Sequence, residues 1–179
     1  DPYSSFTSIL ELFNIKKTSK KGISDFTVID NSSKISDSAY IGSFTSIGKM
    51  SKISDNCIIE NQVYIGNNVE IGCNNTIDRG SLSNTIIGDG TFLDNQVHIA
   101  HNVKIGNNCI IAGQVGIAGS STIGNNVMIG GQAGISGHLK IGNNVKIGGG
   151  SGVIKNISDN KNVMGYPAKD IKKFILENK

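Results

Sequence analysis

The sequence predicts an all-β fold, a parallel β-helix built from hexapeptide repeats. Three observations predict it. Isoleucine recurs at every sixth position, a second small or β-branched residue follows four positions later, and Asn-rich corners recur every 18 residues. A period of six fits neither the 3.6-residue turn of an α-helix nor a long flat strand, so short strands must alternate with regular corners. Three hexads therefore make one triangular coil.

The isoleucine ladder runs in two frames, from Ile23 to Ile77 and from Ile87 to Val153. It has 10 positions before the break and 12 after it, 22 in all. With strands ~4.8 Å apart, this predicts about seven coils and a prism on the order of 35 Å long. Ten residues instead of six separate Ile77 from Ile87. The segment 78–86 is therefore predicted to be a corner or a short excursion.

The second set of inward positions and the corners complete each coil. Small or β-branched residues are expected to point inward beside the ladder at Thr45, Val63, Val69, Val97, Val103, Cys109, Val115, Val127 and Val145. Asn-Asn pairs follow Ile-Gly at 107–108, 125–126 and 143–144. Asn and Gly tolerate left-handed turn conformations, so these pairs are predicted corners.

The two ends of the chain differ from the repeat. Apolar residues at helical spacing predict a short amphipathic helix over 4–13 and another over 169–177. We therefore divide the chain into an N-terminal helix and linker (1–20), the hexapeptide-repeat β-helix (21–165) and a C-terminal helix (166–179). Such helices are expected to cover the open ends of the prism or to pack against neighbouring chains, because the backbone edges there are unpaired.

Composition excludes several classes of protein. The 179 residues suit one domain, and a net charge of +3 with Arg79 as the only arginine gives no case for nucleic-acid binding. The three cysteines form no CxxC pair, which argues against a disulfide framework or a structural zinc site. No apolar run of 18 residues and no leader peptide are present, so we expect no integral membrane segment and a cytoplasmic protein.

The histidines are the candidates for chemistry, because none of them occupies a ladder position. By the 18-residue repeat, His101 aligns with Gly119 and Gly137. Where side chains stack coil upon coil, glycine opens a furrow and exposes backbone N–H groups beside the imidazole. A slender acyl chain or pantetheine arm is expected to lie in this furrow.

The other two histidines are placed by the same repeat. His138 follows His101 by 37 residues, two coils plus one residue, so the two are expected roughly 10 Å apart along the axis and able to line one groove. His98 aligns with Gly116 and Gly134. We interpret it as an exposed histidine without a role.

Several motifs together resemble one family of enzymes. These are Asp94-Asn-Gln-Val-His-Ile-Ala-His-Asn-Val103, its partners at 112–119 and 130–138, Thr76-Ile-Asp-Arg-Gly80 and Gly165-Tyr-Pro-Ala168. They resemble the UDP-3-O-acylglucosamine N-acyltransferases of lipid A biosynthesis over nearly the whole chain. The resemblance implies a left-handed β-helix and a homotrimer with active sites between subunits, although the usual preference for right-handed crossovers would predict the opposite hand. The family's N-terminal uridine-binding domain is not in this sequence, and the acyl-transfer chemistry is expected in the residues present.

The resemblance implies a reaction and its catalytic residues. An (R)-3-hydroxyacyl group would move from acyl carrier protein to the 2-amino group of UDP-3-O-(3-hydroxyacyl)glucosamine. His101 would be the general base, because imidazole ionises near neutral pH. The backbone N–H of Gly119 would stabilise the oxyanion. Asp94 would orient His101, from its own subunit or from a neighbour, although a polar corner residue is an almost equal interpretation.

Substrate binding is assigned in the same way. The resemblance carries His138 over as a second histidine of the site, with Asn95 and Gly137 beside the substrate. As a separate hypothesis, Gly152 and the glycines at 148–150 leave the far end of the furrow open and so admit a long acyl chain.

The thioester is already activated, so we expect no metal and no tightly bound cofactor; 4'-phosphopantetheine would arrive on the acyl carrier protein. Two enzymatic alternatives stay open. One is an amino-sugar acetyltransferase that uses acetyl-CoA, and the other is a zinc enzyme similar to γ-class carbonic anhydrases, with three imidazoles around the metal at subunit interfaces. A scaffold or ice-binding prism would show threonine ladders, which this sequence lacks.

Overall fold

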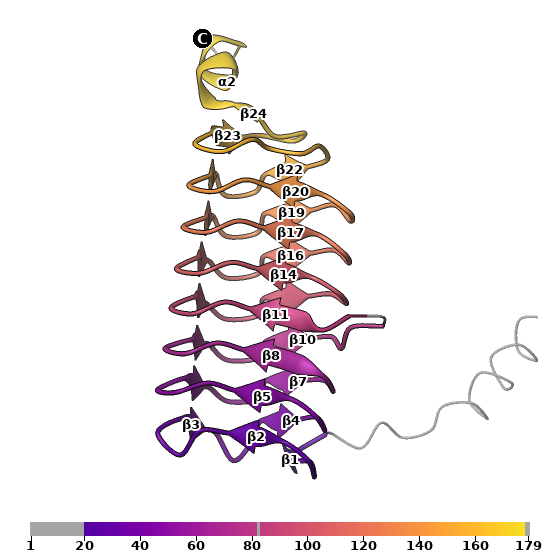
Figure 1. Cartoon of the computed structure of the whole chain (residues 1–179). Helices are drawn as coiled ribbons and strands as arrows, with labels where there is room; N and C mark the ends of the chain where they lie inside the picture. Colours follow the sequence, from indigo (N-terminus) through magenta and orange to yellow (C-terminus); the bar gives the residue numbers. More distant parts are fainter. Residues whose placement is uncertain (1–19, 82, 178–179) are drawn as a thin grey trace, which may run out of the picture.

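The structure is a computed structural model and describes residues 20–81 and 83–177. It is a triangular prism of stacked coils (Figure 1), and each coil contributes one short strand to each of three sheets. This agrees with the predicted left-handed parallel β-helix. The predicted helix over 4–13 lies outside the described residues.

The three faces are three sheets, and from β1 to β22 each strand pairs in parallel with the strand three places along the chain. The first sheet contains β1 (Gly22–Ile23), β4 (Tyr40–Ile41), β7 (Ile58–Ile59), β10 (Thr76–Ile77), β13 (His98–Ile99), β16 (Gly116–Ile117), β19 (Gly134–Ile135) and β22 (Gly152–Val153). The second contains β2 (Val28–Ile29), β5 (Ser46–Ile47), β8 (Val63–Ile65), β11 (Thr85–Ile87), β14 (Lys104–Ile105), β17 (Thr122–Ile123) and β20 (Lys140–Ile141).

The third sheet continues to the C-terminal end of the prism. It contains β3 (Lys34–Ile35), β6 (Lys52–Ile53), β9 (Glu70–Ile71), β12 (Phe92–Leu93), β15 (Ile110–Ile111), β18 (Met128–Ile129), β21 (Lys146–Ile147), β23 (Asn162–Met164) and β24 (Lys169–Asp170). The last strand, β24, runs antiparallel to β23 and leads into helix α2 (Ile171–Glu177). The helix therefore begins two residues later than predicted.

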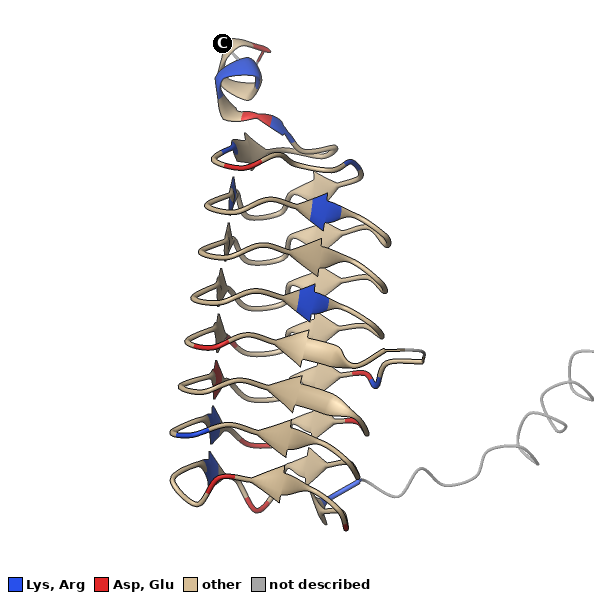
Figure 2. Cartoon of the chain, in the orientation of Figure 1, with Lys and Arg blue, Asp and Glu red and all other residues tan. Residues whose placement is uncertain are grey.

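The ladder residues form the core, as predicted. From Ile41 to Val153 each ladder side chain is at most 4% exposed, and the second inward set, including Thr45 and Cys109, is fully buried. Burying one such aliphatic side chain is worth about 1.5–3 kcal/mol, so the column of isoleucines is the main source of stability. Charged residues are sparse along the prism (Figure 2).

The stack has about eight turns, one more than the ladder predicted. Ile157 follows Val153 by four residues instead of six, and it forms a parallel bridge with Ile141. Val163 then pairs with Ile147. The shortened step shifts the frame of the last turn, which is why a strict period of six stopped at Val153.

The corners are left-handed turns. Residues with φ between +53° and +62° recur at the corners, among them Asn108, Asn126 and Asn144, as the Asn-Asn pairs predicted. The predicted excursion is also present: β10 ends at Ile77 and β11 begins at Thr85, and the described residues between them project from the prism (Figure 1). This projection reaches the corner that carries His101.

Candidate functional site

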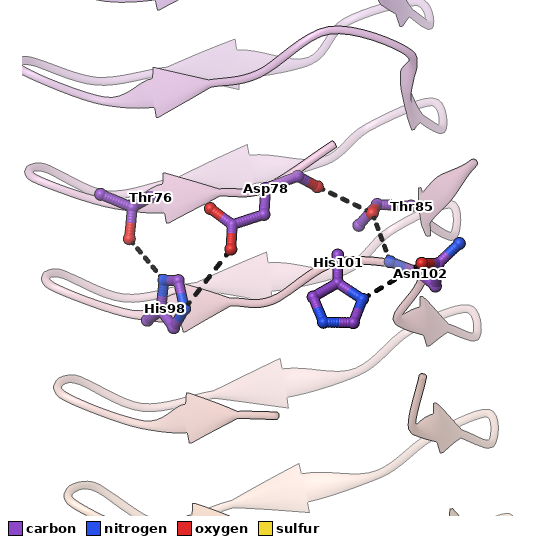
Figure 3. A network of polar contacts seen from close by, with 6 residues as sticks. All are labelled: Thr76, Asp78, Thr85, His98, His101 and Asn102. Carbon is purple, nitrogen blue, oxygen red and sulfur yellow. Dashed lines mark hydrogen bonds and ion pairs between the residues drawn. The ribbon is translucent and has the colours of Figure 1, made fainter. Parts of the chain in front are cut away.

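His101 lies at the corner between β13 and β14, with its side chain exposed. Its Nδ1 atom is 3.1 Å from Oδ1 of Asn102, the next residue (Figure 3). Asn102 has φ +62°, and this left-handed conformation turns the chain at the corner.

The orientation of the Asn102 amide follows from backbone partners that have only one possible role. Its Oδ1 accepts from the backbone N–H of Ser81 at 3.2 Å, and its Nδ2 donates to the carbonyl oxygen of Ser83 at 2.8 Å. The atom facing His101 is therefore an oxygen, which can only accept. In the neutral imidazole, Nδ1 of His101 therefore carries the proton and Nε2 holds the lone pair.

The excursion and the His101 corner are joined by a second set of bonds. The hydroxyl of Thr85 donates to the carbonyl oxygen of Asp78 at 2.8 Å, and it accepts from the backbone N–H of Asn102 at 3.1 Å (Figure 3). Asn102 thus bonds to the excursion through its backbone and its side chain. The excursion therefore holds Asn102 in place, and Asn102 in turn fixes the orientation of the His101 ring.

Gly119, one coil beyond His101, lies directly against the imidazole. A Cβ atom at this position would be 2.5 Å from Cε1 and 2.6 Å from Nε2 of His101, closer than real contacts allow. Only glycine leaves room for the ring as placed. Within the described residues, no hydrogen bond from the Gly119 N–H to the protein is present. The free lone pair of His101 and an unpaired N–H are therefore neighbours, as the repeat predicted.

A groove of about 640 Å³ runs along the first sheet below this corner. It exists because the outward positions of β16 and β19 are Gly116 and Gly134. A Cβ atom at Gly116 or Gly134 would meet nothing within 4 Å, so these two positions are open space. Gly119 lies on the margin of the groove, and the predicted furrow is present.

The far end of the groove is closed, which contradicts the hypothesis of an open end at Gly152. The ring of Tyr166 packs on Gly152, and a Cβ atom there would lie 2.2 Å from Cδ2 of the tyrosine. Tyr166 follows the last turn, outside the ladder, so the repeat could not place it. Gly152 accommodates an aromatic ring, and it does not extend the furrow.

His138 and Gly137 lie at the same edge of the prism as His101, at the corner between β19 and β20. The His138 N–H donates to the carbonyl oxygen of Gly119 at 3.0 Å, and its exposed side chain leaves a backbone with φ +61°. Neither imidazole is among the residues that line the groove, so the expectation that both would line it does not hold in this chain. The two imidazoles lie at the same edge of the prism, beside the groove.

Asp94 and Asn95 lie at a different corner, between β12 and β13. Asp94 Oδ1 accepts from the Asn95 N–H at 2.8 Å, and Asn95 Oδ1 accepts from the Cys73 N–H at 2.7 Å. Both border a second, polar hollow of about 410 Å³. The chain by itself does not bring Asp94 to His101.

His98 is the residue that sequence reasoning undervalued. It projects outward from β13, borders the groove, and its Nδ1 lies 2.7 Å from Thr76 Oγ1 (Figure 3). Its Nε2 is 3.8 Å from Asp78 Oδ2. Two signals could have revealed it. When the extra residues of the excursion are added to the 18-residue period, Thr76 and His98 fall at equivalent positions of neighbouring coils. His98 is also followed, one and two coils later, by Gly116 and Gly134.

Residues 20–81 and 83–177 contain no group of three or more His, Cys, Asp or Glu side chains placed to hold a metal ion. In the same ranges, no helix is long and apolar enough to span a membrane.

The model of the bacterial transferase hexapeptide family (six repeats) matches residues 84–119 and 120–155. Among solved structures, UDP-N-acetylglucosamine O-acyltransferase from Moraxella catarrhalis is 29% identical, with a TM-score of 0.55 over 88% of this chain and 77% of that one. UDP-N-acetylglucosamine acyltransferase from Campylobacter jejuni is 25% identical, with a TM-score of 0.51 over 83% and 73%.

A Bacillus cereus gene product described as an acetyltransferase shares the fold, at 23% identity and a TM-score of 0.51 over 85% of this chain and 84% of that one. At that identity the match shows the fold alone. Residues 84–155 therefore match the bacterial transferase hexapeptide model, and acyltransferases are among the solved structures that the chain resembles.

Proposed function

We propose that the protein is an acyltransferase that acylates an amino sugar, and that it moves a 3-hydroxyacyl group from acyl carrier protein to the 2-amino group of UDP-3-O-(3-hydroxyacyl)glucosamine. The observation that carries the proposal is the pairing at one corner of His101, with its proton on Nδ1, and Gly119, with its N–H unpaired. An acyl transfer to an amine needs both groups.

The steps follow from that geometry. Nε2 of His101 removes a proton as the amine nitrogen attacks the thioester carbon, and the carbonyl electron pair moves to oxygen. The N–H of Gly119 stabilises this oxyanion, since a fixed donor needs no reorganisation during the reaction. The intermediate collapses, the C–S bond breaks, and the proton on His101 passes to the leaving thiolate. No metal enters these steps.

The groove is suited to the acyl chain. It is bordered by glycine backbone and by the exposed apolar side chains of Ala118, Ile154 and Tyr166, so apolar carbon can lie along it. The 4'-phosphopantetheine arm would come with the carrier protein. We place the sugar at the His138 and Gly137 corner, outside the groove.

A homotrimer would complete the site. Asp94 and Asn95 lie at another corner of the same chain, so they reach a His101 only if it belongs to a neighbouring subunit. A threefold arrangement of prisms, corner against face, would bring them there. We propose such an assembly, in the cytoplasm, where acyl carrier protein is found.

A second candidate is O-acylation of UDP-N-acetylglucosamine, which is favoured by the 29% identity to the Moraxella catarrhalis enzyme. The two reactions differ in the acceptor and in the bond formed. An amide product resists mild alkali, whereas an ester is cleaved.

The test presents the purified chain with 3-hydroxyacyl carrier protein or acetyl-CoA, and with each of the two acceptors. Mass spectrometry identifies the product before and after mild alkali. We expect an alkali-resistant acyl group on UDP-3-O-acylglucosamine with the carrier-protein donor. An alkali-labile product on UDP-N-acetylglucosamine would support the second candidate, and transfer from acetyl-CoA alone would reject both.

A further inference from the structure

His98 forms the end of the glycine groove. The outward positions of the first sheet read Thr76, His98, Gly116, Gly134 and Gly152 in register. The groove therefore begins where the imidazole stops and glycine starts. One ring makes the wall at this end, as Tyr166 does at the other.

The ring of His98 is held from the coil before it. Its Nδ1 lies 2.7 Å from the Thr76 hydroxyl, and the Asp78 carboxylate is 3.8 Å from Nε2, too far for a hydrogen bond. The side chain is 51% exposed. A polar ring fixed in this way can bond to a ligand with little loss of side-chain entropy, and Nε2 has room to do so.

The wall also lies close to the proposed reaction centre. His98 pairs in register with Gly116, and Gly119 follows three residues later on the same coil. With the thioester carbonyl at the Gly119 N–H, the first carbons of the acyl chain enter the groove beside His98. The other end of the groove, at Tyr166, is reached only by the tail of the acyl chain.

We infer that His98 is a specificity-determining residue, which hydrogen-bonds the 3-hydroxyl of the acyl chain in the groove. This inference rests on the proposed function. A hydroxyl both donates and accepts, so it can bond to an imidazole nitrogen in either protonation form. With a chain that lacks the hydroxyl, Nε2 of the half-exposed ring stays hydrated, so the preference comes from the hydrogen bond that the hydroxylated chain gains.

The experiment measures binding and transfer separately. Synthetic acyl-pantetheine carrying a 3-hydroxyacyl chain, or the same chain without the hydroxyl, is titrated against the full chain and against His98→Ala, and both acyl carrier proteins are then assayed. We expect the wild type to favour the hydroxylated chain about tenfold in both Kd and kcat/KM, and His98→Ala to lose that preference. Affinity for the plain chain should stay within about twofold.

Two variants separate recognition from structure. His98→Gln keeps a side chain that can hydrogen-bond, and it should recover most of the preference. Lys104→Ala changes the outward residue of β14, on the same coil but another face. It should change neither Kd nor kcat/KM for either donor. Circular dichroism and thermal midpoints check that each variant folds.

Each outcome decides one claim. An equal loss on both donors, or no loss on either, would overturn the role of His98 while leaving the acyl transfer intact. If the wild type binds neither pantetheine, the groove is not an acyl site and the inference fails. If it binds both with the expected preference but transfers neither, the proposed function fails and the recognition by His98 stands.

Discussion

At the scale of single residues, the site depends on one ring whose surroundings fix its chemistry. The Asn102 amide is oriented by backbone groups of the excursion, and this decides which nitrogen of His101 carries the proton. Gly119 then determines where the ring can lie. Asn102 and Gly119 therefore set the tautomer and the position of the ring independently.

Replacing Gly119 by Ala should displace the imidazole. The added Cβ atom would lie 2.5 Å from Cε1 of His101, so the ring must move away from its place beside the Gly119 N–H. A displacement of about 1 Å can cost on the order of a hundredfold in rate. We expect that loss in kcat, measured by steady-state kinetics. Gly131→Ala, at another corner, is the control, because its nearest atom would be a backbone oxygen at 3.2 Å.

Replacing Asn102 by Ala should allow neutral His101 to carry its proton on either ring nitrogen. Without the oxygen acceptor, Nδ1 loses its fixed partner, and ¹⁵N NMR should show a mixture of the two neutral forms. We expect kcat to fall about tenfold or more with little change in KM. Asn102→Asp keeps an oxygen facing Nδ1 and should retain the single tautomer. A single tautomer in Asn102→Ala would contradict this role.

At the scale of elements, the corners depend on residues that adopt the left-handed conformation. Each corner needs a residue in the left-handed region, and Asn supplies it at little cost. Some corners instead use bulky residues. Phe26 and Phe44, both with φ +60°, stack with ring centroids 5.5 Å apart, and Met50 has φ +56°.

Met50→Asn should stabilise its corner. Met50 is 69% exposed, so little packing is lost, and Asn adopts the left-handed conformation more readily. We expect the free energy of unfolding to rise by about 1 kcal/mol, or roughly 2–4 °C in the midpoint, measured by thermal unfolding. Asn68→Met, at an equivalent corner with φ +53°, should lower stability by a similar amount. No change in either variant would show that corner conformation is not limiting.

At the scale of the whole molecule, the prism is a stack in which each coil contacts only its neighbours, and its core includes two buried thiols. Burial raises the pKa of Cys57 and of Cys109. The folded state therefore favours the protonated thiols. Their contribution to stability is complete below about pH 8.5, the ordinary value for an unfolded cysteine, and is lost as the pH rises towards the folded pKa.

The free energy of unfolding, measured in urea, should therefore fall as the pH rises from 8.5 to 9.5, by at most about 1.4 kcal/mol per pH unit for each thiol. The double variant Cys57→Ala, Cys109→Ala should lose most of this slope. Cys73→Ala should keep it, because Cys73 is a half-buried corner residue. An unchanged slope in the double variant would assign the effect to other groups.

The features that could be predicted from the sequence are those whose positions the repeat sets. Positions such as Ile99 and Gly119 follow from the period of six and of 18, so the core, the corners and the glycine beside His101 could be read from the sequence. Tyr166 over Gly152 and the shortened step to Ile157 lie where the period fails. The contact of His98 with Thr76 crosses the excursion, whose length no period sets.

The central claim is that His101 and Gly119 perform acyl transfer at one corner. It is tested most directly by the rate of transfer from 3-hydroxyacyl carrier protein to UDP-3-O-acylglucosamine in the wild type and in His101→Ala, with fold and assembly checked by circular dichroism and sedimentation. We predict a loss of at least about a hundredfold with the fold and assembly intact. Full activity in His101→Ala would contradict the mechanism.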